Sequence, residues 1–540
     1  MNNRSFVGGI WRRGTHECTR RAALSPARVD EDWGWIGDST EMFVRGAGGF
    51  CRLFTWDGLA ILLRGYARPA GFTGRLDLER VAEELRCHYL EQGELAVDAL
   101  DGSFTVALCD SHAERVLLYR NLVGTGFTYY HERPDGLVFG GNLTELVDLV
   151  EDAPAANRDA LPSFFLYRCV PGRDTLFAGF HRLLPGEQVC WDRRGFTRSQ
   201  RHTFASLAGS RIDATEAIDA VDHTMTAILR DCQAAQPRAA NLLSGGIDSS
   251  YIQAIWNKAV AAGTVPVSYS VAVDHPHTWA DTDYAVTASQ TLGCRHVLVP
   301  ADGPYQSYLL DALATTGEPL NHVQSAYFGH LARAMQAGNQ TAGLCGEGAD
   351  SLFGLGLGNQ IQNADVVRRT VPGAWLRQAV AGVAGLAGFD RLAYTFRLAD
   401  RVHDAAWPEH PINRVARFAD VAAVQACFGE SAVYHAAADR RALLDLFAVP
   451  HDPLDRLHAS GFLGEAMDSA GLWTTLFNRA GMDLLCPFLD SRMVRLALRL
   501  PPDVRYRFRR PKAAAQGGGT AHTPGRKSPP DQARVWPAHL

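Results

Sequence analysis

Paired cysteines of the Cys-x-x-Cys type are absent, although the 540 residues include 11 cysteines. Zinc sites and the disulfide frameworks of small secreted domains both need close, regular cysteine spacing. The scattered cysteines therefore indicate neither kind of site. They fit a reducing compartment, and we expect a cytoplasmic protein.

An excess of positive charge is also lacking. The 53 lysine and arginine residues face 58 acidic residues, for a formal net charge of -5 and a pI near 6.4. A general binder of phosphate backbones needs a basic surface. We therefore expect no nucleic-acid partner.

Long hydrophobic runs are missing as well. The segment MNNRSFVGGIWRRG at the start has no apolar core of signal-peptide length. The uncharged, Ala/Gly-rich stretch QAVAGVAGLAGF at 378–389 is too short to cross a bilayer. We expect no membrane partner, and we expect this Ala/Gly-rich run to form a buried helix packed closely against a neighbour.

The composition that is present is ordinary for a globular protein, with 46% hydrophobic and 21% charged residues, and the length allows at least two domains. From about residue 40 to 200, short alternating segments such as SFTVALCD are separated by Asp-Gly and Gly-Gly turns, which predicts antiparallel sheet. A helix with one apolar face is expected at 77–93, so this part is an α+β domain. The pattern is lost near 205–215, and we place the first domain at 1–207.

In the second domain, placed at 208–515, the order changes to alternating strands and helices. Strands are expected at 239–243, 265–273, 296–300 and 341–345, and helices at 251–262, 283–292 and 326–337. This alternation is typical of a parallel sheet with crossover helices, and the fold class is therefore α/β. We expect mostly helix from 350 to 500 and disorder in the Gly/Pro-rich segment 516–540.

The segment NLLSGGIDSS at 241–250 is the most informative in the chain. An apolar strand ends at Leu243 and breaks into a turn, Ser244-Gly245-Gly246, that leads into a helix near Ser249. Glycine lets the backbone fold tightly and brings its N–H groups against a ligand. The positive end of the helix adds free amides, so the loop is suited to an anion with several oxygens.

Polar side chains complete this loop. Ser244, Ser249 and Ser250 supply further donors. Asp248 would repel a phosphate by itself, but it is suited to hold Mg²⁺, which prefers oxygen ligands and bridges to phosphate. An ordinary capped helix start is the alternative, yet five specified residues recur by chance only on the order of 10⁻⁶ per position.

The loop lacks the Gly-Lys-Ser/Thr ending of a Walker A motif. It resembles the SGGxDS pyrophosphate loop of the N-type ATP pyrophosphatases, which cleave ATP between the α and β phosphates. The resemblance implies that ATP and Mg²⁺ are the cofactors. It places the adenine base against the strand ends near Leu243 and Val271.

A second motif, GLCGEGADSLFG at 343–354, resembles the GEGxDE-LFGG motif of the asparagine synthetases. The resemblance implies that Asp350 is the second Mg²⁺ ligand beside Asp248. It also implies that Cys345 and Gly346 contact the nucleotide. Glu347 would face the acceptor side of the site and take part in catalysis.

Other segments extend the likeness to the same family. RRPKAAA at 509–515 resembles its lysine motif, which implies that Lys512 contacts the phosphates and the charge that develops on them. Segments 317–335 and 478–501 also resemble family motifs. Ser351 departs from the pattern, since the family usually has Glu there, so we expect the contacts to the acceptor substrate to differ.

The first domain resembles the glutaminase domain of these synthetases over 98–147 and 173–189. The implied architecture is an Ntn-hydrolase-like sandwich followed by an adenine-nucleotide α-hydrolase-like synthetase domain with helical additions. Such glutaminases use an N-terminal cysteine as nucleophile. Here Asn2 and Asn3 follow the initial Met and the first cysteine is Cys18. We therefore expect a silent glutaminase, with the amine supplied by the substrate itself.

The resemblance implies an ATP-dependent ligase that forms an amide through an acyl-adenylate. We favour a lasso-peptide cyclase, which joins a peptide N-terminal amine to an Asp or Glu side chain, with a leader peptidase and a leader-binding protein as partners. A β-lactam synthetase-like enzyme acting on a small molecule and an ammonia-dependent asparagine synthetase stay open. A catalytically dead scaffold is the alternative of another class.

Overall fold

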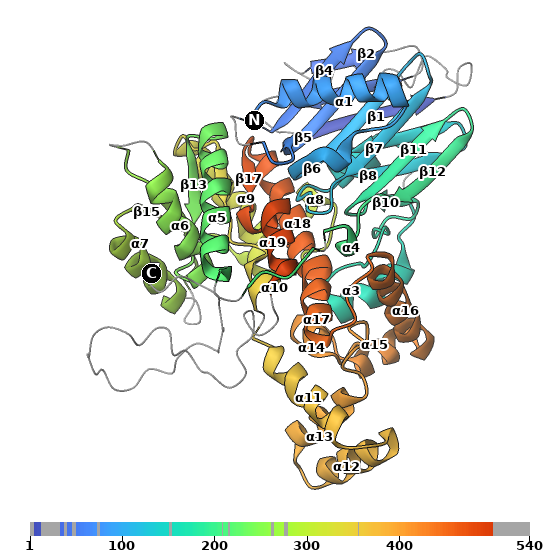
Figure 1. The fold of residues 1–540 in the computed structure, drawn as a ribbon, viewed down its shortest axis with the longest axis vertical. Coiled ribbons are helices and arrows are strands. Elements are labelled where there is room, and N and C mark those ends of the chain that lie inside the picture. The colour runs from blue at the N-terminus through green and yellow to red at the C-terminus, as the bar shows by residue number, and fades with distance from the viewer. Residues whose placement is uncertain are drawn as a thin grey trace.

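The computed structural model describes residues 5–11, 33–36, 40–45, 50–72, 76–150, 154–207, 209–213, 216–260, 264–274, 279–354 and 356–500. These residues form two sandwiched antiparallel sheets, a separate parallel sheet and a largely helical region (Figure 1). The predicted mixed α/β fold class is confirmed. Lys512 and the segment 516–540 lie outside the described residues.

The first two sheets each contain six antiparallel strands, in the orders β10-β8-β9-β1-β3-β2 and β12-β11-β7-β6-β5-β4. Their strands are β1 (Ser5–Trp11), β2 (Trp33–Ile36), β3 (Thr40–Arg45), β4 (Cys51–Trp56), β5 (Leu59–Pro69), β6 (Leu100–Asp110), β7 (Arg115–Arg120), β8 (Tyr129–Arg133), β9 (Gly136–Gly140), β10 (Phe180–Arg182), β11 (Glu187–Asp192) and β12 (Gly195–Gln200). The antiparallel sheet predicted for residues 40 to 200 is therefore confirmed.

The two-residue period of the strands decides which core each side chain enters. Leu62 on β5 is buried in the core between the two sheets, together with Phe6 of β1. Its neighbours Ile61 and Leu63 point to the opposite face and belong to the core under helix α1 (Leu78–Gln92). Both faces of this sheet are therefore covered along its middle strands β5, β6 and β7, which are buried almost throughout.

Helix α1 matches the helix predicted at 77–93. Its N-cap, Asp77, accepts hydrogen bonds from the backbone N–H groups of Glu79 and Arg80, and it ends at Gly93 with φ 70°. Short helices of the same part are α2 (Leu143–Asp148), α3 (Leu161–Tyr167) and α4 (Phe204–Leu207), with 3-10 turns η2 (Val97–Ala99) and η3 (Arg158–Ala160).

The third sheet is fully parallel, with strand order β15-β14-β13-β16-β17. Its strands are β13 (Ala239–Leu242), β14 (Val267–Ala272), β15 (Arg295–Pro300), β16 (Ala342–Leu344) and β17 (Asp483–Leu485). The flanking helices are α5 (Ala217–Ala235), α6 (Ile247–Ala259), α7 (Trp279–Leu292), α8 (Tyr305–Thr316), α9 (Phe328–Ala337), α18 (Met467–Arg479) and α19 (Ser491–Arg499), with 3-10 turns η4 (Val323–Tyr327) and η6 (Pro487–Leu489). The predicted parallel sheet is confirmed, but β17 and α8 were not predicted.

The helical region is inserted in the sequence between β16 and β17, and it lies below the sheets in Figure 1. Its elements are α10 (Ala349–Phe353), α11 (Gly358–Thr370), α12 (Ala374–Leu386), α13 (Asp390–Ala399), α14 (Pro411–Ala416), α15 (Val421–Phe428), α16 (Glu430–Leu446), α17 (Pro453–Gly461) and a π-helical turn η5 (Phe462–Ala466).

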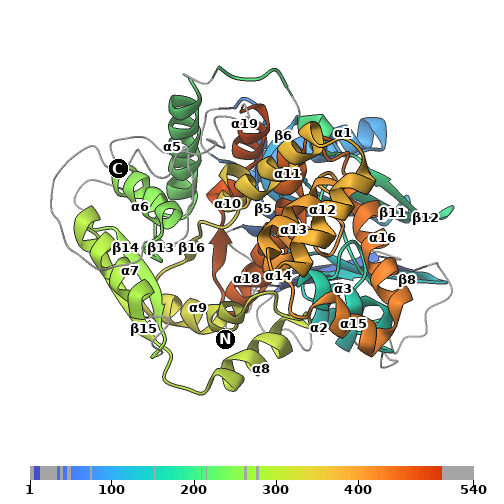
Figure 2. The ribbon, with the colours of Figure 1, turned by 90° about the horizontal axis from the view of Figure 1, so that it is seen from below.

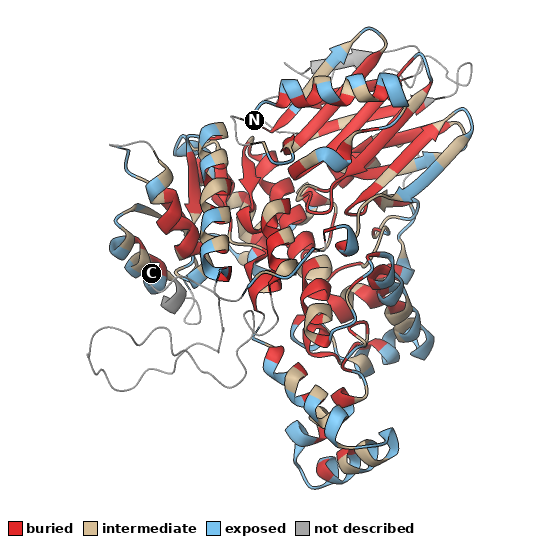
Figure 3. Ribbon diagram, viewed as in Figure 1, coloured by how far each residue is buried: buried red, intermediate tan, exposed pale blue. Residues whose placement is uncertain are grey.

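Helix α12 corrects one expectation. The Ala/Gly-rich run at 378–389 was predicted to be buried, yet its large side chains are exposed, Leu386 at 93% and Phe389 at 64%. The helix pairs with α13 to form a hairpin that projects from the body of the protein, and Figure 3 shows its mostly exposed surface. Among the described residues of α12, only the small Ala381 and Ala384 are buried, so its larger side chains have no neighbour there to cover them.

The sandwich and the parallel sheet share one continuous hydrophobic core. Helix α19 lies against β6 (Figure 2), and Tyr66 Oη donates to Asp490 Oδ2 at 2.9 Å, across the boundary between the two parts. Arg182 on β10 makes two hydrogen bonds to Glu318 and one to Asp468, at 2.7 to 3.0 Å. No helix in the described part of the chain is long and apolar enough to cross a membrane.

Candidate active site

The loop predicted to bind pyrophosphate lies at the carboxyl end of β13, the middle strand of the parallel sheet. Ser244 N–H donates to Ser249 Oγ at 3.1 Å, and Gly246 N–H donates to Ser244 Oγ at 3.3 Å. Ser249 is buried, whereas Ser250 N–H donates to Gly246 O as in an ordinary first helical turn. The serines therefore fix the shape of the turn, a role that the sequence did not predict.

Gly245 can be only a glycine without a shift of its surroundings. Its φ is +74°, and a Cβ atom built on it would lie 2.4 Å from the carbonyl carbon of Tyr284, on helix α7. Gly246 has a negative φ, and a Cβ there would meet only Ser244 Oγ, at 3.2 Å. The two glycines therefore have different roles. Gly245 allows a left-handed turn, and Gly246 leaves the start of the helix open to a ligand.

Helix α6 begins earlier than predicted, at Ile247 instead of Tyr251. Asp248 and Ser249 therefore lie in its first turn, not in the loop. The N-cap residue is Gly246, which has no side chain to bond the first amides of the helix. A helix start without a side-chain cap is suited to an anionic ligand, because its amides and its dipole both favour negative charge.

The second motif lies next to this loop because β16 pairs with β13 in parallel register, with Asn241 opposite Leu344. Parallel strands bring their carboxyl ends to the same edge of a sheet. A Cβ atom on Gly346 would lie 3.4 Å from Cβ of Asp248 and 3.5 Å from the backbone nitrogen of Ser249. The structure therefore brings the two predicted motifs into contact.

Cys345 is buried beside Cys486, which follows the neighbouring strand β17, and its N–H donates to Leu485 O at 2.8 Å. A hydrogen bond from Cys486 lowers the pKa of the Cys345 thiol, and burial opposes this effect. The neighbour Cys486 was not predicted, because β17 was not.

Glu347 is half-buried, and its predicted role on the acceptor side stays a prediction. Burial, and then the negative charges of Cys345, Glu465 and Asp350, hold the pKa of its carboxyl well above the usual range. Glu347, Asp350 and Glu465 therefore form a region of negative potential. Such a region favours a bound cation, whether a metal ion or a protonated amine.

Leu243 and Val271 lie at the same edge of the parallel sheet. Leu243 is buried and its N–H donates to Tyr269 O at 2.9 Å, while Val271 lies two residues further along β14 and is half-buried. This edge is the usual ligand-binding edge of an open α/β sheet.

The helical region adds a group of polar residues that sequence reasoning missed. Buried His458, on α17, has its Nδ1 at 2.6 Å from Ser351 O. Glu465 lies in the π-helical turn η5 and pairs with His322 Nε2 at 3.2 Å, and Arg168 donates to His322 Nδ1 at 3.1 Å. A π-helical turn is rare and is often found at functional sites, but nothing in the sequence marks it.

The donor set fits a magnesium ion held together with phosphates. Asp248 and Asp350 offer carboxylates from two adjacent motifs, and Mg²⁺ in nucleotide sites takes one or two carboxylates besides water and phosphate oxygens. Within the described ranges, no group of three or more His, Cys, Asp or Glu residues is arranged to hold a metal ion by itself. Lys512 lies outside the described residues, so its predicted role stays a prediction.

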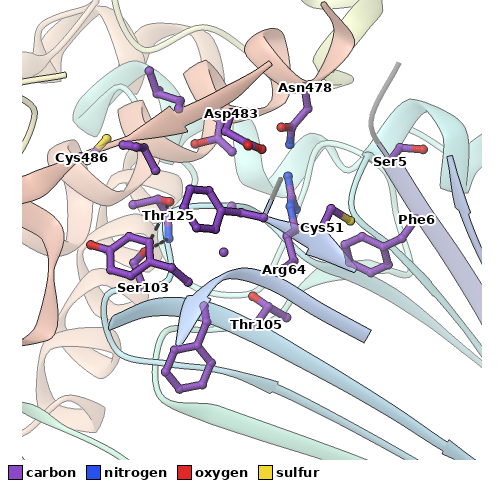
Figure 4. Close-up of a pocket in the computed structure, with 18 residues that line it drawn as sticks. Ser5, Phe6, Cys51, Arg64, Ser103, Thr105, Thr125, Asn478, Asp483 and Cys486 are labelled. Atoms are coloured by element: carbon purple, nitrogen blue, oxygen red, sulfur yellow. Dashed lines mark hydrogen bonds between the residues drawn. The ribbon is translucent and has the colours of Figure 1, made fainter. Parts of the chain in front are cut away.

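A small cavity of about 40 Å³ marks the end of the sandwich that faces β17 (Figure 4). Buried Arg64 lines it, with its Cζ atom 5.6 Å from the ring centroid of Phe6, and burial lowers the pKa of its guanidinium. Asn478 and Asp483 of the second part close it from the other side. The predicted silence of this domain as a glutaminase stays a prediction, because residues 1–4 lie outside the described ranges.

Comparison with known proteins gives two family matches. Residues 220–516, which are more than half of the chain, match the family described as asparagine synthase. Residues 71–203 match the glutamine amidotransferase domain family. No curated protein matches the chain.

Two solved structures are similar at low identity. One is described as the allosteric regulatory enzyme of purine biosynthesis, with 11% identity, a TM-score of 0.22, and coverage of 56% of this chain and 76% of that chain. The other is a glutamine phosphoribosylpyrophosphate amidotransferase from B. subtilis complexed with ADP and GMP, with 12% identity, a TM-score of 0.23, and coverage of 63% and 81%.

Proposed function

Because the chain belongs to the asparagine synthase family and is an ATP-dependent ligase that forms amide bonds, we propose that it closes an amide bond within a peptide, as lasso-peptide cyclases do. The amine is the peptide N-terminus and the acid is an Asp or Glu side chain. The contact between Gly346 and Asp248 carries the proposal, because it joins a phosphate-binding turn to an acidic acceptor region.

The residues support a reaction in two steps. In the first step, the substrate carboxylate attacks the α-phosphorus of ATP, and pyrophosphate leaves. The loop from Ser244 to Ser250 is suited to receive the departing pyrophosphate through backbone amides at an uncapped helix start. Asp248 and Asp350 would hold Mg²⁺, which stabilises the charge that grows on the phosphate oxygens.

In the second step, the tethered amine attacks the acyl carbon of the adenylate, and AMP leaves. Glu347, whose raised pKa reflects burial and neighbouring negative charge, would face the incoming amine. An ammonium group is stabilised by this acidic region until it loses its proton. Holding amine and adenylate in one cavity replaces a bimolecular encounter, and it keeps water from the adenylate.

Ser351 supports a substrate other than aspartate. Asparagine synthetases usually carry Glu at this position, whereas this chain has a buried Ser whose carbonyl contacts His458. A β-lactam synthetase-like reaction on a small molecule is the second candidate, since it needs the same adenylating residues. Glu347 argues against it, because β-lactam synthetases typically have Tyr there.

The test is a reaction of the full chain with ATP, Mg²⁺ and a candidate precursor peptide from which the leader has been removed. We expect AMP and pyrophosphate in equal amounts and a peptide product that has lost the mass of one water. Asp248→Asn and Asp350→Asn should each lower the rate at least ~100-fold, which corresponds to the loss of about 3 kcal/mol of transition-state stabilisation. The exposed Asp390→Asn is the matched control and should keep full activity.

Other products would redirect the assignment. ADP in place of AMP would contradict adenylation altogether. Asparagine formed from aspartate and ammonia would favour the synthetase, and cyclisation of a small β-amino acid would favour the β-lactam reaction. A chain that releases no AMP with any of these substrates would be a scaffold in peptide maturation, where a leader peptidase and a leader-binding protein would be its partners.

A further inference from the structure

A second cavity, of about 40 Å³, lies between the sandwich and the helical region, away from the loop described above. It is called the seam cavity here and is bordered by Arg120 at the end of β7, Arg182 on β10, Arg440 on α16, and Asp468 on α18. Its remaining wall is mostly apolar, with Phe127, Leu443 and Met467 among its residues. A largely apolar cavity bordered by three buried arginines is unusual, because buried charges are normally paired.

Arg182 is the arginine whose charge is compensated. Its guanidinium bonds both oxygens of Glu318, at 2.8 and 2.7 Å, and Oδ1 of Asp468 at 3.0 Å. These two carboxylates are the partners that this cluster of arginines has among the described residues. Of the three guanidinium groups, only that of Arg182 therefore has a carboxylate within salt-bridge distance in the described part of the chain.

Arg120 is almost fully buried, at 2% exposure, and has no carboxylate within 4 Å in the described part of the chain. Its Nε donates to Gly124 O at 2.8 Å and its Nη1 to Leu183 O at 3.1 Å, while its Nη2 has no hydrogen-bond partner among the residues that the structure describes. Burial and the nearby charges of Arg182 and Arg64 lower the pKa of Arg120 to about 9. A lowered pKa is what burial produces for a cation that has no anion beside it.

Arg440, on the opposite wall of the cavity, also lacks a carboxylate within 4 Å in the described part of the chain and also has an N–H group without a partner there. It is 4% exposed, its Nη2 donates to Ser460 Oγ at 2.8 Å, and its Nε has no partner among the described residues. Its Cζ lies 4.7 Å from the ring centroid of Tyr167, a cation–π contact that offsets part of the charge. Glu465, one residue beyond the wall residue Gly464, pairs with His322. Against the effect of burial, this hydrogen bond and the more distant charges of Arg168 and Arg440 lower the pKa of Glu465.

Water could satisfy the two orphan N–H groups, since the cavity has room for a few water molecules. Water would not neutralise these two guanidinium groups, and a buried guanidinium without a carboxylate partner is strongly destabilising. A small anion would satisfy both groups and balance the charge. We propose that the seam cavity binds one small inorganic anion, such as chloride, between Arg120 and Arg440, and that this anion joins the sandwich to the helical region.

Bromide is the probe for a direct test. Crystals of the full chain soaked in bromide should show one anomalous peak in the seam cavity, within hydrogen-bond distance of Arg120 and Arg440. A cavity filled only by ordered water at saturating bromide would overturn the proposal. The outcome does not depend on the ligase reaction, so it stands or fails separately from the proposed function.

A solution measurement separates specific binding from general salt effects. At constant ionic strength, replacing gluconate, which is too large for the cavity, by chloride should raise the Tm of the wild type by about 2 °C, since a ligand that binds only the folded state stabilises it. Arg120→Gln and Arg440→Gln should each abolish this rise, whereas the exposed Arg391→Gln should keep it. An equal rise in all four proteins, or none in the wild type, would contradict the site. If one of the two cavity variants does not fold, the Tm of the other variant and the anomalous bromide map still test whether the anion site exists.

Discussion

Gly245 shows how much a single residue fixes in the pyrophosphate loop. It combines a left-handed φ of +74° with a position where a Cβ would meet the backbone of α7. The chain must therefore bend back at this point and pass directly under Tyr284. The neighbouring Gly246 is under neither constraint, so the same substitution at Gly246 is a control for the substitution at Gly245.

We expect Gly245→Ala to lower the free energy of unfolding by about 2 kcal/mol, because a left-handed alanine is strained and its methyl group needs α7 to move. Gly246→Ala should cost less than about 1 kcal/mol, since its φ is already that of an ordinary residue. Urea denaturation of both variants measures the difference. Equal losses would show that the loop is free to rearrange.

For single residues, the sequence was most informative where the residues of a site are consecutive in the chain. The residues of the predicted pyrophosphate loop and of the Gly-Glu-Gly-Ala-Asp motif are consecutive in the chain, so their resemblance to family motifs could be seen in the sequence, and their roles stay predictions. Their contact through Gly346 and Asp248 followed from the parallel pairing. His458 and Glu465 could not be predicted, because they lie in separate elements and belong to no recognised motif. The resemblance of segment 317–335 to a family motif did not indicate that His322 pairs with Glu465.

Secondary structure elements behave differently according to their length. The long amphipathic helix α1 and the alternating strands were predicted close to their observed bounds. Strand β17 has only three residues and follows a long helical stretch, so no periodicity could reveal it. Helix α12 was predicted to be buried because its residues are apolar, but burial depends on a neighbour that the sequence does not name.

The exposure of α12 can be tested with a pair of leucines. Leu386 on α12 is 93% exposed, whereas Leu398 on the partner helix α13 is fully buried. We expect Leu386→Ala to change the free energy of unfolding by less than about 0.5 kcal/mol, and Leu398→Ala to lower it by about 2–5 kcal/mol. Chemical denaturation gives both values. A large loss for Leu386→Ala would mean that the hairpin folds back onto another surface in solution.

Across the whole molecule, polar contacts and a shared core join the sandwich to the rest. Arg182 is the central polar contact, since it lies on β10 and binds carboxylates that belong to the synthetase part. In the sequence, Arg182 is 136 positions from Glu318 and 286 positions from Asp468. Sequence patterns report mainly on near neighbours, so such a contact could not be predicted.

We expect Arg182→Met to lower the free energy of unfolding by about 3–5 kcal/mol, because it leaves Glu318 and Asp468 buried without their cation. Adding Glu318→Gln and Asp468→Asn to this variant should recover part of the loss, since the amides carry no charge. The comparison separates the cost of an unpaired charge from the loss of packing. No recovery in the triple variant would assign the loss to packing.

The late position of β17 has a consequence for how the protein is made. A nascent chain has already completed β16 and must produce the whole helical region before Asp483–Leu485 can pair with it. Until then the edge of β16 has no partner on that side, and α19, which closes the core under β6, has not been synthesised. The nucleotide edge of the sheet therefore matures after most of translation is over, and ribosome-bound intermediates should expose β16 to chaperones.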